Sequence, residues 1–265
     1  MRSTAFSGDA QQRRSRQPEI AMPRRSGGSS EHWRLIHDPP RQSLLADVLV
    51  GRVLDQMTDT AAADIGRAED LLRQTLGQSP SDPVARYAKG NLLRQARRCE
   101  AAILEYETVI EFDRNEPGAY ANLGWCKFLT GAIEEAIPAL EQALRLSPRD
   151  SRAGNWHARI GLVHLLQSRT PEALLWAERA GSTSPALPYV HALLASAYGQ
   201  EGVSERAAVE LAEAQRLSAA NRYSSIARLR TAGLDGSGFW GGPKTRALFE
   251  ATYFAGLRKA GMPEE

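Results

Sequence analysis

Apolar and polar residues alternate along most of this chain with the period of an amphipathic helix. In residues 117–150, apolar side chains recur three or four positions apart over 119–130 and again over 133–146, with Gly131 between the two stretches. Such spacing places the apolar side chains on one face of each helix. The pattern predicts two α-helices joined by a tight turn, and we expect them to pack as an antiparallel hairpin.

The helix pair recurs with a period of 34 residues. Small residues recur where paired helices would cross, so that Gly124 and Ala136 correspond to Gly90 and Ala102 of the preceding segment. A single hairpin cannot bury its apolar face, whereas stacked hairpins can. We therefore predict an all-α solenoid over residues 41–221. Its repeats are expected at about 49–82 (degenerate), 83–116, 117–150, 154–187 and 188–221.

Three short strings resemble a known repeat family. They are Ala-Tyr-Ala-Asn-Leu-Gly at 119–124, Glu-Glu-Ala-Ile at 134–137 and Ala-Leu-Arg-Leu-Ser-Pro at 143–148. Together with the period, they make the chain over 49–221 resemble the tetratricopeptide repeat family. The resemblance implies a right-handed superhelix of antiparallel helix hairpins, in which the first helices line a concave surface that binds a partner.

A narrower resemblance rests on four longer strings. They are NLGWCKFLTG (122–131), RIGLVHLLQSRTPEA (159–173), RYSSIARL (222–229) and ALFEATYFAGLRKAGMPE (247–264). They are similar to the C-terminal repeat region of bacterial adenylate/guanylate cyclase proteins, and similar repeats also follow winged-helix regulatory domains. In both architectures an enzymatic or DNA-binding module precedes the repeats. Here about 45 residues precede them, without a strand-rich run bearing paired aspartates. We therefore expect a stand-alone or truncated repeat region.

The flanks differ in composition from the repeats. Residues 1–40 are rich in Arg, Ser, Gln and Gly, which predicts a disordered basic leader. An apolar pattern over 44–57 predicts the first helix of the degenerate opening hairpin. Residues 222–265 are predicted to form helices that cap the last repeat, because a terminal repeat exposes an apolar face. An alternative makes four aromatic residues of this region a docking patch: Phe239, Trp240, Phe249 and Phe254.

Composition and charge narrow the class of partner. The chain has 42% hydrophobic and 24% charged residues, as soluble domains do, and a net charge of +2. A nucleic-acid-binding domain usually has a strong basic excess, so we expect no nucleic-acid partner. No apolar run reaches the ~18 residues of a membrane span. The only two cysteines, Cys99 and Cys126, cannot form a disulfide framework. The expected location is the cytoplasm, with a homodimer as one possible state.

No residue cluster indicates catalysis, a cofactor or a metal. His157, His164 and His191 fall at positions where the resembled family has bulky aromatic residues, which favours helix packing over metal binding. Cys99 and Cys126 fall inside predicted helices and are expected to be buried small hydrophobic residues. Paired glutamates such as Glu134 and Glu135 lie at helix N-terminal turns, where they complement the helix dipole. We expect no enzymatic activity.

The resemblance also suggests where a partner would bind. Some members of the family grip the C-terminal carboxylate of a peptide with Lys, Asn, Asn, Lys and Arg. Asn91, Asn122 and Arg159 match that set by register, whereas Tyr87 and Asn155 replace the two lysines. Losing both lysines removes much of the charge that would hold a carboxylate. We therefore expect a groove for a mixed apolar and polar segment.

The predicted groove is drawn from the first helices of three repeats. Trp125 is the expected anchor, since buried aromatic residues often dominate interface energies. Asn91, Arg94 and Arg159 are expected to be exposed. The full set is Tyr87, Asn91, Arg94, Gln95, Asn122, Trp125, Phe128, Leu129, Arg159, Leu162 and Leu166.

The function hypothesis is a non-catalytic scaffold that binds a protein or peptide partner in this groove. Two alternatives follow from the narrower resemblance. One is the regulatory half of a nucleotide cyclase, and the other is the repeat part of a transcription regulator without its DNA-binding domain.

Overall fold

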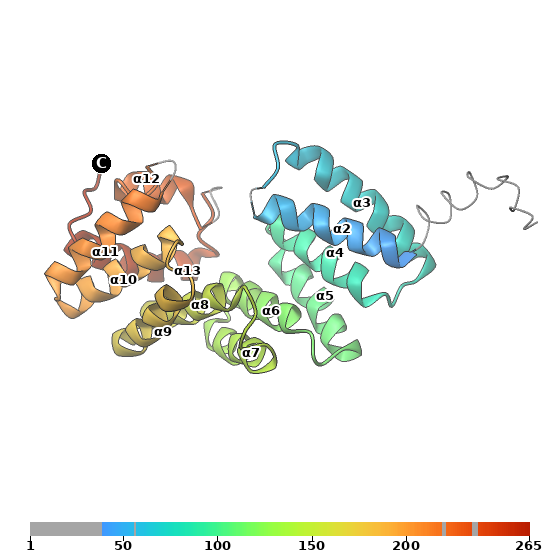
Figure 1. The fold of residues 1–265 in the computed structure, drawn as a ribbon, viewed down its shortest axis with the longest axis horizontal. Helices are drawn as coiled ribbons and strands as arrows, with labels where there is room; N and C mark the ends of the chain where they lie inside the picture. Colours follow the sequence, from blue (N-terminus) through green and yellow to red (C-terminus); the bar gives the residue numbers. More distant parts are fainter. Residues whose placement is uncertain (1–38, 56, 219–220, 235–237) are drawn as a thin grey trace, which may run out of the picture. The chain divides into compact units, whose positions relative to one another are not determined.

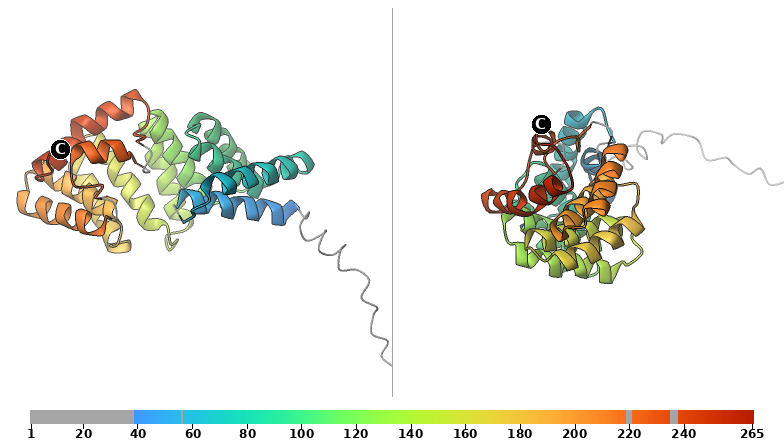
Figure 2. Two further views of the ribbon diagram at one scale, coloured as in Figure 1. Left: turned by 90° about the horizontal axis from the view of Figure 1, so that it is seen from above. Right: turned by 90° about the vertical axis from the view of Figure 1, so that its left-hand side faces the viewer.

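The computed structural model describes residues 39–55, 57–218, 221–234 and 238–265, and every regular element in these ranges is helical. Five helix pairs follow one another along the described chain (Figures 1 and 2). They are α2 (Pro39–Leu54) with α3 (Ala61–Gln78), α4 (Pro83–Gln95) with α5 (Cys99–Phe112), α6 (Pro117–Thr130) with α7 (Ile133–Leu146), α8 (Ala153–Leu166) with α9 (Thr170–Thr183), and α10 (Pro188–Glu201) with α11 (Ser204–Leu217). None of these helices combines the length and the hydropathy that a membrane span needs.

The pairs are stacked. The second helix of each pair packs against the first helix of the next, as α5 does against α6 and α7 against α8. The first helices also contact one another in chain order, from α2 through α4, α6 and α8 to α10, and they line the inner side of the stack. The predicted all-α fold of stacked antiparallel hairpins is confirmed.

Proline and left-handed residues set the helix ends. Pro83, Pro117 and Pro188 occupy the first turns of α4, α6 and α10, where a missing backbone N–H costs nothing. The turn inside each of the last four hairpins contains one residue with positive φ, at equivalent positions of the repeat: Arg97, Gly131, Ser168 and Gly202. Glycine adopts this conformation freely, whereas another residue pays roughly 1–2 kcal/mol. The repeat therefore imposes the same turn even where the sequence lacks glycine.

Small residues permit the close helix crossings that the sequence predicts. A Cβ atom at Gly124 would lie 2.8 Å from the carbonyl oxygen of Ala136, and one at Gly90 would lie 2.6 Å from the ring of Tyr106. Leu140 and Tyr106 are fully buried beside these crossings. Each hairpin is thus held by backbone approach together with apolar side chains.

The opening hairpin begins earlier than the sequence suggested. The helix expected over 44–57 runs instead from Pro39 to Leu54, and the expected leader lies outside the described residues except for its last two. Ser43 is fully buried and its hydroxyl donates to Asp82 Oδ2 at 2.9 Å. The first residues of α2 are polar, as those of the leader are. Ser43 among them nevertheless packs against the turn that joins α3 to α4.

A buried polar network joins α2 to the two hairpins that follow it. Asn122 Nδ2 donates to Asn91 Oδ1 at 2.9 Å and to the hydroxyl of Tyr87 at 3.1 Å. The Tyr106 hydroxyl also donates to Asn91 Oδ1, and Asn91 Nδ2 donates to Asp47 Oδ1 on α2 at 3.2 Å. Asn91 is only 5% exposed. The expectation that Asn91 is exposed was wrong, because its amide satisfies buried polar groups.

The C-terminal segment returns across the first helices. It comprises α12 (Ile226–Ala232), α13 (Pro243–Leu248), the π-helix η1 (Phe249–Phe254) and α14 (Ala255–Lys259). α14 packs on α10 and α11, η1 on α8 and α10, and α13 on α6. The Gly242 N–H donates to Leu129 O at 3.0 Å, and the Thr245 hydroxyl donates to Phe128 O at 3.3 Å. The segment therefore packs on the last hairpin and also covers part of the inner side of the two hairpins before it.

Aromatic residues hold the segment together. The Trp240 ring lies 4.7 Å from that of Phe249 and 5.0 Å from that of Phe254, both edge to face, and its Nε1 donates to Arg230 O. These three aromatic residues are at most 6% exposed. They pack on one another and leave little exposed surface for docking, whereas Phe239 stays half-buried at the edge of the cluster.

The crossing of α10 and α14 is tight enough to test. A Cβ atom at Gly199 would lie 2.2 Å from Gly256 O, whereas one at Gly66 in α3 meets nothing within 4 Å. We expect Gly199→Ala to lower the free energy of unfolding by about 1–3 kcal/mol through overpacking. Gly66→Ala should raise it by about 0.5–1 kcal/mol. Urea unfolding followed by circular dichroism measures both, and equal stabilisation by the two would contradict the crossing.

The polar network gives a second prediction. Asn91→Ala removes the partner of buried groups on Asp47, Tyr106 and Asn122, so the free energy of unfolding should fall by about 1–3 kcal/mol. Asn115 is exposed in a turn, and Asn115→Ala should change it by less than about 0.5 kcal/mol. The same urea titration compares them. An unchanged Asn91→Ala protein would show that the network contributes nothing to stability.

Candidate functional site

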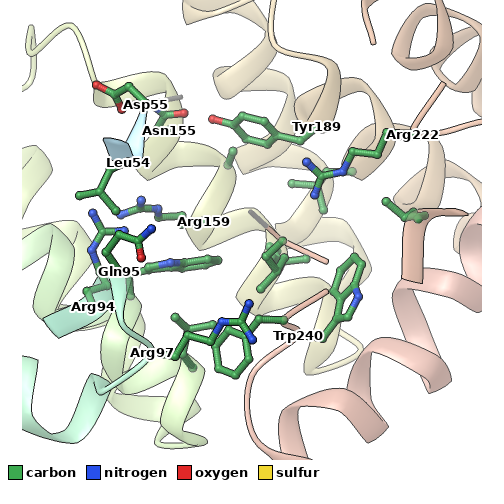
Figure 3. A pocket seen from close by; sticks show the side chains of 18 of the residues that line it. Leu54, Asp55, Arg94, Gln95, Arg97, Asn155, Arg159, Tyr189, Arg222 and Trp240 are labelled. Carbon is green, nitrogen blue, oxygen red and sulfur yellow. The ribbon is translucent and has the colours of Figure 1, made fainter. Parts of the chain in front are cut away.

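A pocket of about 670 Å³ lies on the inner side of the stack, between the first helices and the returning C-terminal segment. One wall is formed by the C-terminal ends of α2 and α4, the floor by α6, α8 and α10, and the opposite wall by residues from 222–234 and 239–253. Figure 3 shows Arg94, Gln95 and Arg159 together on one side, with Arg222 and Trp240 on the other. Segments far apart in sequence therefore build one site.

Six of the eleven groove residues predicted from the sequence line this pocket. They are Arg94, Gln95, Trp125, Leu129, Arg159 and Leu162. Arg94 and Arg159 were expected to be exposed, but both are half-buried in the pocket wall. Arg94 reaches the pocket from the C-terminal end of α4, and Arg159 from the middle of α8.

The other five predicted groove residues lie elsewhere. Tyr87, Asn91 and Asn122 belong to the polar network behind α2. Phe128 is fully buried, with its ring 4.9 Å from Trp125 and 6.1 Å from Phe249, under the C-terminal segment. Leu166 belongs to the same apolar core and is 1% exposed. These five do not line the pocket.

Arginines of the pocket lie over aromatic rings that also line it. The Arg159 guanidinium lies 4.7 Å from the centroid of Trp125, a distance that permits a cation–π interaction. Arg97, at its strained turn, lies 5.4 Å from the ring of Phe239. The contact between Arg97 and Phe239 joins the end of α4 to the C-terminal segment, so the inner face is closed at that point.

The positive charge in the pocket is poorly compensated. Burial lowers the pKa of Arg159 to about 10, and the neighbouring Arg94 guanidinium acts in the same direction. The Nε atoms of Arg94 and Arg222 are buried without a hydrogen-bond partner. Among the lining residues that the structure describes, Asp55 is the one that carries a carboxylate.

Some lining residues were missed by the sequence reasoning. Tyr189 and Leu193 stand one repeat after Asn155 and Arg159, so extending the groove by one period would have found them. Arg222 lies outside the repeats, and nothing in its local sequence indicates that the chain turns back toward α8.

The histidines and cysteines show no convergent ligand set. In the described ranges, no three His, Cys, Asp or Glu side chains group as metal ligands would. Cys99 and Cys126 are buried, as expected. His164 is buried, whereas His191 pairs with Glu210 Oε2 at 2.7 Å between the two helices of the last hairpin.

Comparison with known proteins agrees with the fold. The family model described as "Tetratricopeptide repeat" matches residues 61–119, 87–151 and 130–188. The cell division cycle protein 27 homolog of Caenorhabditis elegans is 32% identical over 108 residues, 41% of this chain. The protein O-mannosyl-transferase TMTC1 of Mus musculus is 29% identical over 87 residues, 31% of this chain. The matches span only 13% and 9% of those two proteins.

Solved structures of similar fold cover more of the chain. Pseudomonas aeruginosa pilF is similar over 83% of this chain and 89% of its own, with a TM-score of 0.59 and 17% identity. TTC0263, a thermophilic TPR protein of Thermus thermophilus, covers 67% of this chain and 96% of its own (TM-score 0.52, 22% identity). MamA of Desulfovibrio magneticus RS-1 covers 66% and 94% (TM-score 0.53, 18% identity). Identities this low show the fold alone.

The narrower similarity to repeats of cyclases and winged-helix regulators stays a prediction. The 34-residue period, the stacked hairpins and the matched segments agree with one another. Residues 61–188 match the tetratricopeptide repeat model, and helices α2–α11 form a right-handed α-solenoid of the tetratricopeptide type.

Proposed function

We propose that the chain is a non-catalytic scaffold that binds a segment of a protein partner in the pocket on its inner face. Tetratricopeptide repeats bind protein or peptide partners, and solenoids use their concave surfaces for this purpose. The observation that supports the proposal is the pocket itself, which joins apolar walls with half-buried polar groups on the first helices. Such a combination is typical of binding sites.

The C-terminal segment shapes what the partner can be. It covers part of the inner side of α6, α8 and α10, including Phe128, which would otherwise lie in a long open groove. A partner helix or long strand along the whole face would have to displace this segment. We therefore propose that a few residues of the partner enter the pocket beside Leu162 and Gln95, with the remainder outside.

Blocking the pocket tests the proposal. Gln95 is half-buried in the pocket wall, so Gln95→Trp should fill the pocket without changing the core of a hairpin. Peptides selected by display against the full chain should bind this variant at least about tenfold more weakly, which corresponds to ~1.4 kcal/mol. Fluorescence polarisation of a labelled selected peptide measures the affinity.

The matched control is Gln78→Trp. Gln78 is exposed at the end of α3, outside the pocket, and the same substitution there should leave the affinity unchanged. The proposal is wrong if peptide display enriches no peptide, or if every enriched peptide binds the Gln95→Trp variant and the wild type equally.

A further inference from the structure

The pocket contains more positive charge than the protein itself neutralises. Four arginines line it (Arg94, Arg97, Arg159 and Arg222), and the one carboxylate among the described lining residues is that of Asp55. Arg94 and Arg222 each leave a buried Nε atom without a hydrogen-bond partner. Buried charges in proteins are normally paired, because an unpaired one loses its hydration without compensation. An arrangement of this kind is relieved by a bound anion.

Two of these arginines act on one another. Arg94 and Arg159 lie on the same side of the pocket (Figure 3), and the proximity of Arg94 contributes to the lowered pKa of Arg159. Trp125 holds the Arg159 guanidinium from one side by the cation–π contact. Arg159 is thus oriented before any ligand arrives, and two guanidinium groups can bind the oxygens of a single oxyanion.

The opposite side of the pocket carries Arg222 beside apolar and aromatic side chains. Leu193 and Trp240 line it, and Phe239 stands at its edge beneath Arg97. A ligand that fits both sides joins an oxyanion to an apolar or aromatic body. The volume of about 670 Å³ is within the range of pockets that enclose such a group.

The charge balance favours a dianion over a carboxylate. Four arginines line the pocket against the one carboxylate of Asp55, so the lining has a formal excess of three positive charges. A carboxylate supplies one negative charge, whereas a phosphate monoester supplies roughly 1.5–2 near neutral pH. We infer that Arg94 and Arg159 hold a phosphate monoester on a side chain of the bound partner segment, with the aromatic or apolar body of that side chain against Leu193 and Trp240. The inference rests on the proposed function for the source of the phosphate.

A small probe tests this site without knowledge of the partner. N-acetyl-O-phosphotyrosine amide is titrated into the full chain, and ³¹P NMR linewidth and the thermal midpoint report binding. N-acetyltyrosine amide, which lacks the phosphate, should not bind at the same concentration. Affinity should fall below about pH 6, where the monoester loses its second negative charge.

Variants of the arginines locate the site. Arg94→Gln and Arg159→Gln should each weaken binding of the phosphorylated probe at least about tenfold, because each removes hydrogen bonds to a charged group. Arg159→Lys keeps the charge without the planar fork of the guanidinium, so its loss of affinity for the probe should be smaller. Arg98 is exposed four residues after Arg94 and outside the pocket, and Arg98→Gln should bind as wild type does.

Each outcome decides the inference. Equal binding by all variants would show an adventitious surface site, and equal binding of the unphosphorylated amide would remove the role of the phosphate. Binding of adenosine monophosphate without binding of the phosphotyrosine amide would overturn the assignment to a side chain. If no probe binds while a display-selected peptide still depends on Gln95, the phosphate assignment fails and the proposed function stands. If no display-selected peptide depends on Gln95 either, both the phosphate assignment and the proposed function fail.

Discussion

The return of the C-terminal segment over the first helices is the packing on which the site depends. A helical solenoid leaves the inner face of its first helices uncovered, and the backbone approach of Gly199 to Gly256 seats α14 against that face. Earlier in the same segment, Thr245 and Gly242 donate to the carbonyl groups of Phe128 and Leu129 on α6. Without this packing the inner face would be a long groove, and with it the face becomes a pocket of limited size.

The architecture of the repeats could be predicted because its causes are local. Helical periodicity, prolines in first turns and small residues at crossings such as Gly124 act within one hairpin, and the period copies them along the chain. The same register placed Arg94 and Arg159 on the inner face. The start of α2 was predicted too late because its polar residues, such as Ser43, are buried by contacts to later repeats.

The site was only half predictable because burial there is decided by distant residues. Phe128 has the position of a groove residue within its own repeat, and it is Phe249 that covers it. The family resemblance suggested Asn91 and Asn122 as groove positions. The Asn91 amide instead bonds to Asp47, Tyr106 and Asn122, and so joins α2 to the stack. No pattern within 34 residues contains the contacts of Asp47 and Phe249, since these two residues lie near opposite ends of the described chain.

The closure of the pocket by Phe239 and Trp240 has a consequence for synthesis. The chain emerges from the ribosome with its N-terminal end first, so the hairpins that supply Arg94, Trp125 and Arg159 can form before the aromatic wall exists. The pocket is complete only after residues beyond 240 have emerged and α14 has docked on α10. Nascent chains that end before the aromatic wall would therefore possess the solenoid but not the pocket.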